Sequence, residues 1–295
     1  MKNRILCAAL AALLLACGSV SVHAGAKIDG RASTEAYIAD ITVDGKIDDA
    51  WNYANEVTIS LVKKKNADWY KDTMKTGVDY AGVTIRTLWD GKDTLFLLWN
   101  VKDKTPNKPG STSWKQDSVE FFTNMKNEKD GSANITQWRM VYDTQKYNLP
   151  GTPPEGCTAA SSKTADGWIA ELAVNVKDVG GAGQYLGLEF QYNDNVVGKE
   201  NREVCLGWTD DNDSAGKNNA KHGQCLLSAT KVADLKAAAE KAAAEKAAAD
   251  KAAAEKAAAA KTTAAPKTAD ASVVIASAAA VSALAVLVIR KKNER

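Results

Sequence analysis

The stretch WIAELAVNV at residues 168–176 decides the fold class. Every second residue from Trp168 onward is apolar, while Glu171 and Asn175 belong to the other set of positions. Successive side chains of a strand point to opposite faces of a sheet, so a period of two predicts a strand with one face in the core. The Asp166-Gly167 pair just before it is a turn signal. The stretch therefore predicts a half-buried strand that starts after a tight turn.

The same alternation recurs on both sides of this stretch. Clusters of Gly, Asn, Asp and Pro separate the alternating runs, and no long helical pattern interrupts them before residue 231. The runs lie at residues 83–89, 95–101, 119–122, 138–142 and 186–192. Short half-buried strands joined by turns are typical of an antiparallel β-sandwich. We therefore expect an all-β fold, an antiparallel β-sandwich, over residues 37–229, which is enough chain for one domain with a sizeable core.

Residues 1–24 have the pattern of a secretory signal peptide. The start is positively charged, residues 5–16 are apolar, and Val22-His23-Ala24 is a small-x-small cleavage site. We expect cleavage after this site, with residues 25–36 as a linker to the sandwich. The alternative is a lipoprotein processing site with Cys17 as the lipidated residue.

Residues 230–262 differ sharply in composition from the predicted sandwich. Between Lys236 and Lys261 the sequence Ala-Ala-Ala-Glu-Lys repeats, with an Asp variant. Alanine is the strongest helix former, and the acid–base pairs recur at a spacing that brings opposite charges together on a helix. No apolar stripe larger than alanine is present, so the segment lacks the seam of a coiled coil. We expect a solvated helical spacer about 40 Å long.

The C-terminal pattern predicts a membrane anchor. Residues 272–289 carry no charge and are long enough to cross roughly 27 Å of hydrocarbon as a transmembrane helix. The basic tail at residues 290–295 would stay in the cytoplasm by the positive-inside rule, which leaves everything before the helix outside the cell. The short segment 263–271 before the helix contains Pro266, Lys267, Thr268 and Ala269.

This ending resembles the cell-wall sorting signals of Gram-positive surface proteins. In that family a sortase cuts after the Thr of a Leu-Pro-x-Thr-Gly motif and joins that Thr to peptidoglycan. Here Ala265 and Ala269 stand where the family has Leu and Gly. The resemblance implies cleavage after Thr268, with sortase and peptidoglycan as partners, and a plain transmembrane anchor is the alternative.

Charge, cysteine and histidine content exclude several classes of function. The formal net charge of +2 gives no long-range field that favours nucleic acid. Only three cysteines follow the predicted cleavage site, Cys157, Cys205 and Cys225, too few for a disulfide scaffold. Cys205 and Cys225 either pair across a loop or remain free thiols. His222 is the one histidine after that site, which argues against His-based catalysis or a multi-His metal site.

Four blocks within the predicted sandwich resemble family 9 carbohydrate-binding modules and occur in the family's order. They are DGKIDDAW at 44–51, LWD at 88–90 with the run up to residue 103, WKQDSVEFF at 114–122 and DGWIAELA at 166–173. The resemblance implies a β-sandwich that binds sugars and has no catalysis of its own.

The resemblance also implies the possibility of structural calcium, and no other cofactor is expected. Asp44, Asp48, Asp49 and Asp90 are hard oxygen donors of the right type for this ion. The alternative is that these residues only shape turns.

Exposed aromatic residues flanked by polar side chains are the features that a sugar site needs. Sugar rings pack their C–H faces on flat aromatic surfaces, and their hydroxyls bond to planar polar groups. Trp114 and Trp208 both stand at the edge of a polar loop. The family clamps a terminal sugar between one Trp from each of these regions, so the resemblance makes these two the clamp candidates. The tryptophans expected in the core are Trp51, Trp89, Trp99, Trp138 and Trp168.

Three polar residues join the two tryptophans as ligand candidates. Glu120 follows Trp114 on the next predicted strand, at a position that the family uses to bind sugar hydroxyls. Its alternative role is a cross-strand ion pair with Arg139. Arg139 and Gln191 are further candidates on polar strand faces. The sequence does not rank Asn193, Asn195 and Arg202 as additional donors and acceptors.

We expect non-catalytic carbohydrate binding at the bacterial cell surface, which captures poly- or oligosaccharide for breakdown by other proteins. A glycosidase pair of Asp117 and Glu120 is disfavoured because residues three apart on a strand face opposite ways, and Asp117 fits a strand-entry turn better. A haem-binding electron-transfer sandwich would use Met140 with His222. A protein-binding surface adhesin is the third alternative.

Overall fold

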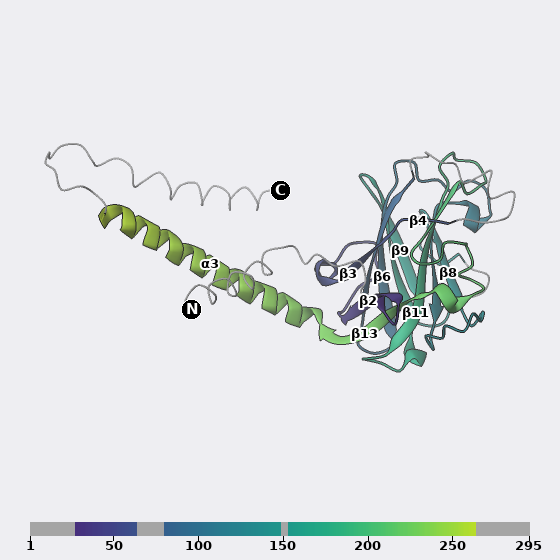
Figure 1. Cartoon of the computed structure of the whole chain (residues 1–295). Coiled ribbons are helices and arrows are strands. Elements are labelled where there is room, and N and C mark those ends of the chain that lie inside the picture. Colours follow the sequence, from purple (N-terminus) through teal and green to yellow (C-terminus); the bar gives the residue numbers. More distant parts are fainter. Residues whose placement is uncertain (1–26, 64–79, 149–152, 264–295) are drawn as a thin grey trace. The chain divides into compact units, whose positions relative to one another are not determined.

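The computed structural model describes residues 27–63, 80–148 and 153–263 (Figure 1). These residues form strands, short 3-10 helices and one long α-helix. The strands are β1 Lys27–Ile28, β2 Arg31–Ile38, β3 Asn55–Ile59, β4 Leu61–Val62, β5 Gly82–Trp89, β6 Thr94–Lys102, β7 Ser118–Asn124, β8 Thr136–Val141, β9 Thr158–Thr164, β10 Gly167–Asn175, β11 Tyr185–Asp194, β12 Val204–Gly207 and β13 Gly223–Lys231. The 3-10 helices are η1 Asp49–Tyr53, η2 Ser113–Lys115, η3 Lys177–Val179 and η4 Asn219–Lys221, and the α-helix is α3 Val232–Thr263.

Within the described residues the strands form one hydrogen-bonded sheet. Its main path runs β4-β12-β11-β13-β2-β5-β6-β10-β9. Strand β7 pairs with β11, β8 pairs with β7, and β3 pairs with β5. The strand predicted at 168–176 is β10, which pairs with β6 over its whole length and begins after the expected turn at Asp166-Gly167. The period-two pattern therefore located six strands correctly, β5, β6, β7, β8, β10 and β11, and the other strands were not among its predictions.

The sheet is mixed, so the prediction of purely antiparallel pairing is wrong at one strand. Strand β2 lies parallel to β13 and, through Tyr37 and Ile38, parallel to the end of β5. Parallel neighbours need a long crossover connection. The chain between β2 and β5 supplies one, with η1 and β3 in it.

The main core lies between the β5-β6-β10 and β8-β7-β11 parts of the sheet. The ring of Trp99 on β6 meets that of Phe190 on β11 edge to face, with centroids 5.5 Å apart. Trp138 on β8 stacks with Phe121 on β7 in the same cluster. All five tryptophans predicted in the core are buried: Trp51, Trp89, Trp99, Trp138 and Trp168.

The outer face of β5, β6 and β10 is also buried, which explains why these strands carry few polar residues. A second apolar cluster there contains Trp51, Leu98, Ile169 and, from the start of α3, Val232. Trp51 donates its indole N–H to Glu171 Oε1 at 3.1 Å, so the polar position of the 168–176 stretch has a buried partner. This contact fixes the DGKIDDAW segment against β10.

The alanine-rich segment forms the predicted helix. α3 is 32 residues long, about 48 Å, and nearly all of its described side chains beyond Val232 are exposed. Lys246 pairs with Asp250 one turn later at 3.8 Å. No helix in the described part of the chain is long and apolar enough to cross a membrane. The predicted signal peptide, the motif Pro266–Ala269 and the transmembrane run 272–289 lie outside the described residues.

Candidate functional site

The polar faces of β7, β8 and β11 form a platform on the side of these strands away from the main core. Glu120 lies directly opposite Arg139 on β8 and opposite Gln191 on β11. Phe122 and Gln137 form the next cross-strand pair on the same face. Because strand side chains alternate between faces, the neighbours Phe121, Trp138 and Phe190 fill the core while these five residues face outward. Alternation along the three paired strands thus places four polar side chains and one aromatic ring on the same face.

Glu120 is the centre of the hydrogen-bond network on this platform. Its Oε1 accepts from Arg139 at 2.5 Å and from Gln137. Its Oε2 accepts from Gln191 at 3.0 Å and from Asn193 at 2.9 Å. Four donors therefore surround a fully buried carboxylate, which compensates its loss of hydration. The predicted ion pair with Arg139 is present. Glu120 also lines a cavity that lies between these strands and Trp114.

Trp114 forms one wall beside the platform. It lies in η2, just before β7, and is partly exposed. The guanidinium of Arg202 sits over the Trp114 ring, with Cζ 5.5 Å from the centroid. Arg202 in turn pairs with Asp213 at 2.9 Å, and Arg139 donates to Ser113 at 3.0 Å next to the ring. These contacts fix the position of the Trp114 ring at the edge of the polar platform.

Platform and wall enclose a cavity of about 380 Å³. Its lining consists of Trp114, Glu120, Phe122, Gln137, Arg139, Gln191, Arg202, Asp213, Gly216 and Lys217. The buried polar atoms of this lining without a hydrogen-bond partner include the acceptor Oε1 of Gln191 and the donor Nε of Arg139. Buried polar groups are normally satisfied, so these atoms leave hydrogen-bonding capacity in the lining of the cavity.

Buried charges fix the loop 208–217, which contributes Asp213, Gly216 and Lys217 to the cavity lining. Glu189 accepts from the backbone N–H groups of Thr209 and Asp210 at 3.0 and 3.2 Å. Asp210 accepts from the backbone of Ser214 at 2.6 Å, and Lys63 Nζ lies 3.3 Å from its Oδ2. Burial acts to lower the pKa of Lys63, but nearby acidic groups, Cys205 and then Glu189, raise it above its ordinary value. Lys63 therefore stays charged and pairs with Asp210 in this loop.

The structure does not bring Trp208 to this cavity. Its ring packs on Phe190 with centroids 5.4 Å apart and lies against Gly223, where any side chain would collide with it. Its backbone N–H is tied to the main chain of Phe190 at 3.1 Å. The ring of Trp208 therefore packs on the core, and Trp208 is not among the residues that line this cavity. The other four predicted ligand residues, Trp114, Glu120, Arg139 and Gln191, all line it.

The family model described as "Carbohydrate family 9 binding domain-like" matches residues 43–230. The chain belongs to this family. Exoglucanase XynX of Acetivibrio thermocellus is 30% identical over 198 residues, which cover 66% of this chain and 17% of that protein. Endo-1,4-beta-xylanase A of Thermotoga maritima is 29% identical over 205 residues, covering 68% of this chain and 18% of that enzyme. The chain therefore spans less than a fifth of the length of these relatives.

Solved structures of family 9 show the same fold. A family 9 carbohydrate-binding module from Caldicellulosiruptor kristjanssonii, in complex with cellotriose, superposes with a TM-score of 0.56 at 20% identity over 68% of this chain and 95% of that one. The structure of such a module from the same organism in complex with glucose matches equally well, with 97% of its chain covered.

Three of the four aspartates named as calcium candidates of this family 9 domain make local contacts in turns, and the fourth, Asp49, begins η1. Asp90 Oδ1 accepts from the backbone N–H groups of residues 92, 93 and 94. Asp44 pairs with Lys46 at 2.8 Å, and Asp48 accepts from the backbone of Thr42 at 3.3 Å. No cluster of metal-ligand type includes any of the four within the described residues.

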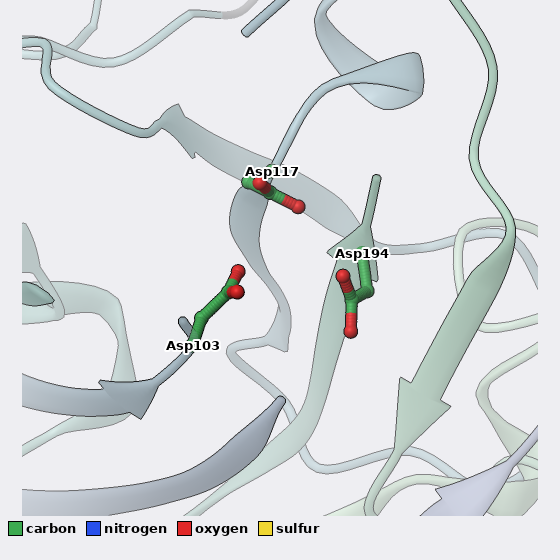
Figure 2. Close-up of side chains that lie close together, drawn as sticks. All are labelled: Asp103, Asp117 and Asp194. Atoms are coloured by element: carbon green, nitrogen blue, oxygen red, sulfur yellow. The ribbon is translucent and has the colours of Figure 1, made fainter. Parts of the chain in front are cut away.

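A different set of carboxylates has the geometry for a cation. Asp103 follows β6, Asp117 precedes β7 and Asp194 ends β11, and Figure 2 shows their carboxylates converging. One oxygen of each lies within 4.8 Å of the others, and all three are buried. Calcium takes carboxylate oxygens at about 2.3–2.6 Å, so three donors spaced this way fit around one ion. Bound there, calcium would offset two of the three negative charges and tie β6, β7 and β11 together.

Burial raises the pKa values of two carboxyl groups in this cluster, Asp117 and Asp103. Burial raises the pKa of Asp117 to about 9, with Asp103 and Asp194 adding to the rise against hydrogen bonds from the backbone. Burial also raises the pKa of Asp103, which accepts from Tyr192 Oη at 3.2 Å. Without a cation, the cluster therefore favours a bound proton.

The remaining cysteine and histidine expectations are resolved in the described residues. Cys157, Cys205 and Cys225 are not joined by disulfide bonds in the described residues, so Cys205 and Cys225 do not pair across the loop. Met140 lies in the main core, whereas His222 sits beside Phe122 with Nε2 2.9 Å from the carbonyl oxygen of Ala215. The structure does not join Met140 and His222 in one site.

Sequence reasoning missed half of the cavity lining. Phe122 and Gln137 stand two residues from Glu120 and Arg139, and that same-face spacing would have found both. Asp213 and Lys217 carried no such signal, because they belong to a loop without periodicity. Arg202 had been named without a rank.

Proposed function

We propose that the chain binds carbohydrate, without chemistry on it, in the cavity beside Trp114. A single observation carries this proposal: the cavity combines a partly exposed indole with a buried unpaired acceptor, Gln191 Oε1, and a buried unpaired donor, Arg139 Nε. A sugar presents a C–H face to an indole, and each hydroxyl both donates and accepts hydrogen bonds. One sugar therefore satisfies all three features.

The family 9 relatives support a ligand of the glucose or xylose type. Structures from this family hold cellotriose and glucose, and the sequence relatives include xylanases. The cavity volume of about 380 Å³ lies at the lower end of ligand pockets, which suits one or two sugar units better than a long chain segment. We propose a sandwich-type module that captures poly- or oligosaccharide for breakdown by other proteins.

Replacing Gln191 with methionine tests the proposal at its unpaired acceptor. Glucose, cellobiose and xylobiose are titrated calorimetrically into the chain, and the variant is expected to bind at least one of them about tenfold more weakly, because a buried hydroxyl loses its partner. Gln184→Met, at an exposed glutamine outside the cavity, is the control and should bind as the parent does. If no carbohydrate binds to the parent chain, the proposal fails and a protein ligand becomes the better explanation.

We also propose that the chain is displayed on the outer face of a bacterial cell by its C-terminus. The sorting-like motif Pro266-Lys267-Thr268-Ala269, the uncharged run 272–289 and the basic tail support this proposal. Cell-wall protein released by muramidase is expected to end at Thr268 when its C-terminal peptide is read by mass spectrometry. An intact tail in purified membranes would instead indicate a plain transmembrane anchor.

A further inference from the structure

The hydrogen-bonding capacity left over in the cavity is unevenly divided between acceptors and donors. Both carboxylates of the lining are already engaged: Glu120 accepts from four donors, and Asp213 accepts from Arg202. Among the buried atoms of the lining, the unpartnered ones include the acceptor Gln191 Oε1 and the donor Arg139 Nε–H, and the ammonium of Lys217 adds further donors at the rim. A ligand that contacts both Arg139 Nε–H and Lys217 must bring acceptor atoms to them.

The cavity lining also carries more positive than negative charge. Three cations and two carboxylates line it, and two of the cations are paired, Arg139 with Glu120 and Arg202 with Asp213. Lys217 is exposed at the rim, and within the described residues it has no ion pair. Lys115 adds a further positive charge next to the cavity, with its Nζ 5.5 Å from the centre of the Trp114 ring. The mouth of the cavity therefore has a positive excess.

We propose that the preferred ligand is a sugar that carries a carboxylate, a hexuronate unit at the end of an oligosaccharide. A carboxylate adds acceptor atoms and no donor, and its charge complements Lys217 and Lys115. The ring still packs on Trp114, and a ring hydroxyl still donates to Gln191 Oε1. This inference rests on the proposed function and narrows the class of sugar that the same site takes.

Binding of acidic and neutral sugar pairs tests the inference. Glucuronate is compared with glucose, and galacturonate with galactose, by calorimetry on the full chain at pH 7 and low ionic strength. We expect the acidic member of at least one pair to bind about threefold to tenfold more tightly, and we expect the preference to shrink at 0.5 M salt, because exposed charges are screened. The pair that shows the larger preference distinguishes a glucuronate source from a galacturonate source.

Lys217→Gln assigns the preference to the cavity mouth. The ratio of acidic to neutral affinity is expected to fall toward one in this variant and to persist in Lys92→Gln, a control at an exposed lysine in the turn between β5 and β6. Neutral sugars that bind as well as their acidic partners in the parent chain would overturn the inference while leaving the proposed function intact. If neither class of sugar binds, the proposed function fails together with the inference.

Discussion

Replacing Trp114 with alanine is expected to weaken sugar binding by about thirtyfold, or about 2 kcal/mol, and to change the free energy of unfolding little. The ring is partly exposed, lies in the short helix η2 and is absent from both apolar clusters of the core. It supplies the one indole surface of the cavity, so its removal deletes the packing face and leaves the polar platform. Calorimetric titration with the best-binding sugar gives the loss of affinity, and urea unfolding gives the stability.

Trp208→Ala is the matched comparison and should show the opposite pattern. Its ring fills the space between Phe190 and Gly223, so we expect a loss of about 3 kcal/mol in the free energy of unfolding. At a temperature where the variant is folded, its affinity should change less than that of Trp114→Ala. Unchanged sugar binding by Trp114→Ala would show that the sugar sits elsewhere, and a large affinity loss in folded Trp208→Ala would return that residue to the site.

The contrast between these tryptophans shows where sequence reasoning stops. Both stand at the edge of a polar loop, and that position alone says nothing about where the ring points. Trp114 extends beside the platform, whereas the backbone of Trp208 is tied to Phe190 and Glu189, which turns its ring onto the core. That second arrangement depends on contacts between distant segments, which a local pattern does not contain.

Strand positions were predictable for the opposite reason. In WIAELAVNV the alternation is a local property of the chain, and a half-buried strand follows from it directly. Arg139 and Gln191 were found in the same way, because each sits on the polar side of an alternating run, whereas the resemblance to family 9 pointed to Glu120. The parallel pairing of β2 with β13 joins the two ends of the domain, and no local pattern encodes it.

The acidic cluster of Asp103, Asp117 and Asp194 is the clearest case of a tertiary feature. Sequence reasoning sought calcium ligands among aspartates that are close in sequence, at residues 44–49, with Asp90 as a further candidate. The three that converge come from the ends of β6 and β11 and the start of β7, and pairing of β7 with β11 sets two of them together. Asp117 lies at a strand entry, as expected. Its membership of the acidic cluster depends on Asp103 and Asp194, which are distant in sequence.

Calcium is expected to raise the melting temperature of the chain by about 5–10 °C at a free concentration 100-fold above its dissociation constant. That excess corresponds to about 2.7 kcal/mol of stabilisation, and a domain of this size gains a few degrees per kcal/mol. The physical reason is that the ion replaces repulsion among three buried carboxylates with attraction. Differential scanning calorimetry with a chelator, with calcium and with magnesium measures the effect, and magnesium should stabilise less because it dehydrates reluctantly.

Asp117→Asn should have opposite effects with and without the ion. In chelator the parent's Asp117 has a pKa of about 9 in the folded state, against about 3.9 when unfolded, so its contribution is fully present below pH 4 and is lost as pH rises toward 9. Asparagine carries no such charge, so the variant should melt at a higher temperature than the parent at pH 8 in chelator and show a flatter pH dependence. With calcium the order should reverse, because the variant has lost a charged ligand.

Asp178→Asn, at an exposed aspartate outside the cluster, should follow the parent in both conditions. Equal calcium stabilisation of the parent and Asp117→Asn would place any bound ion elsewhere.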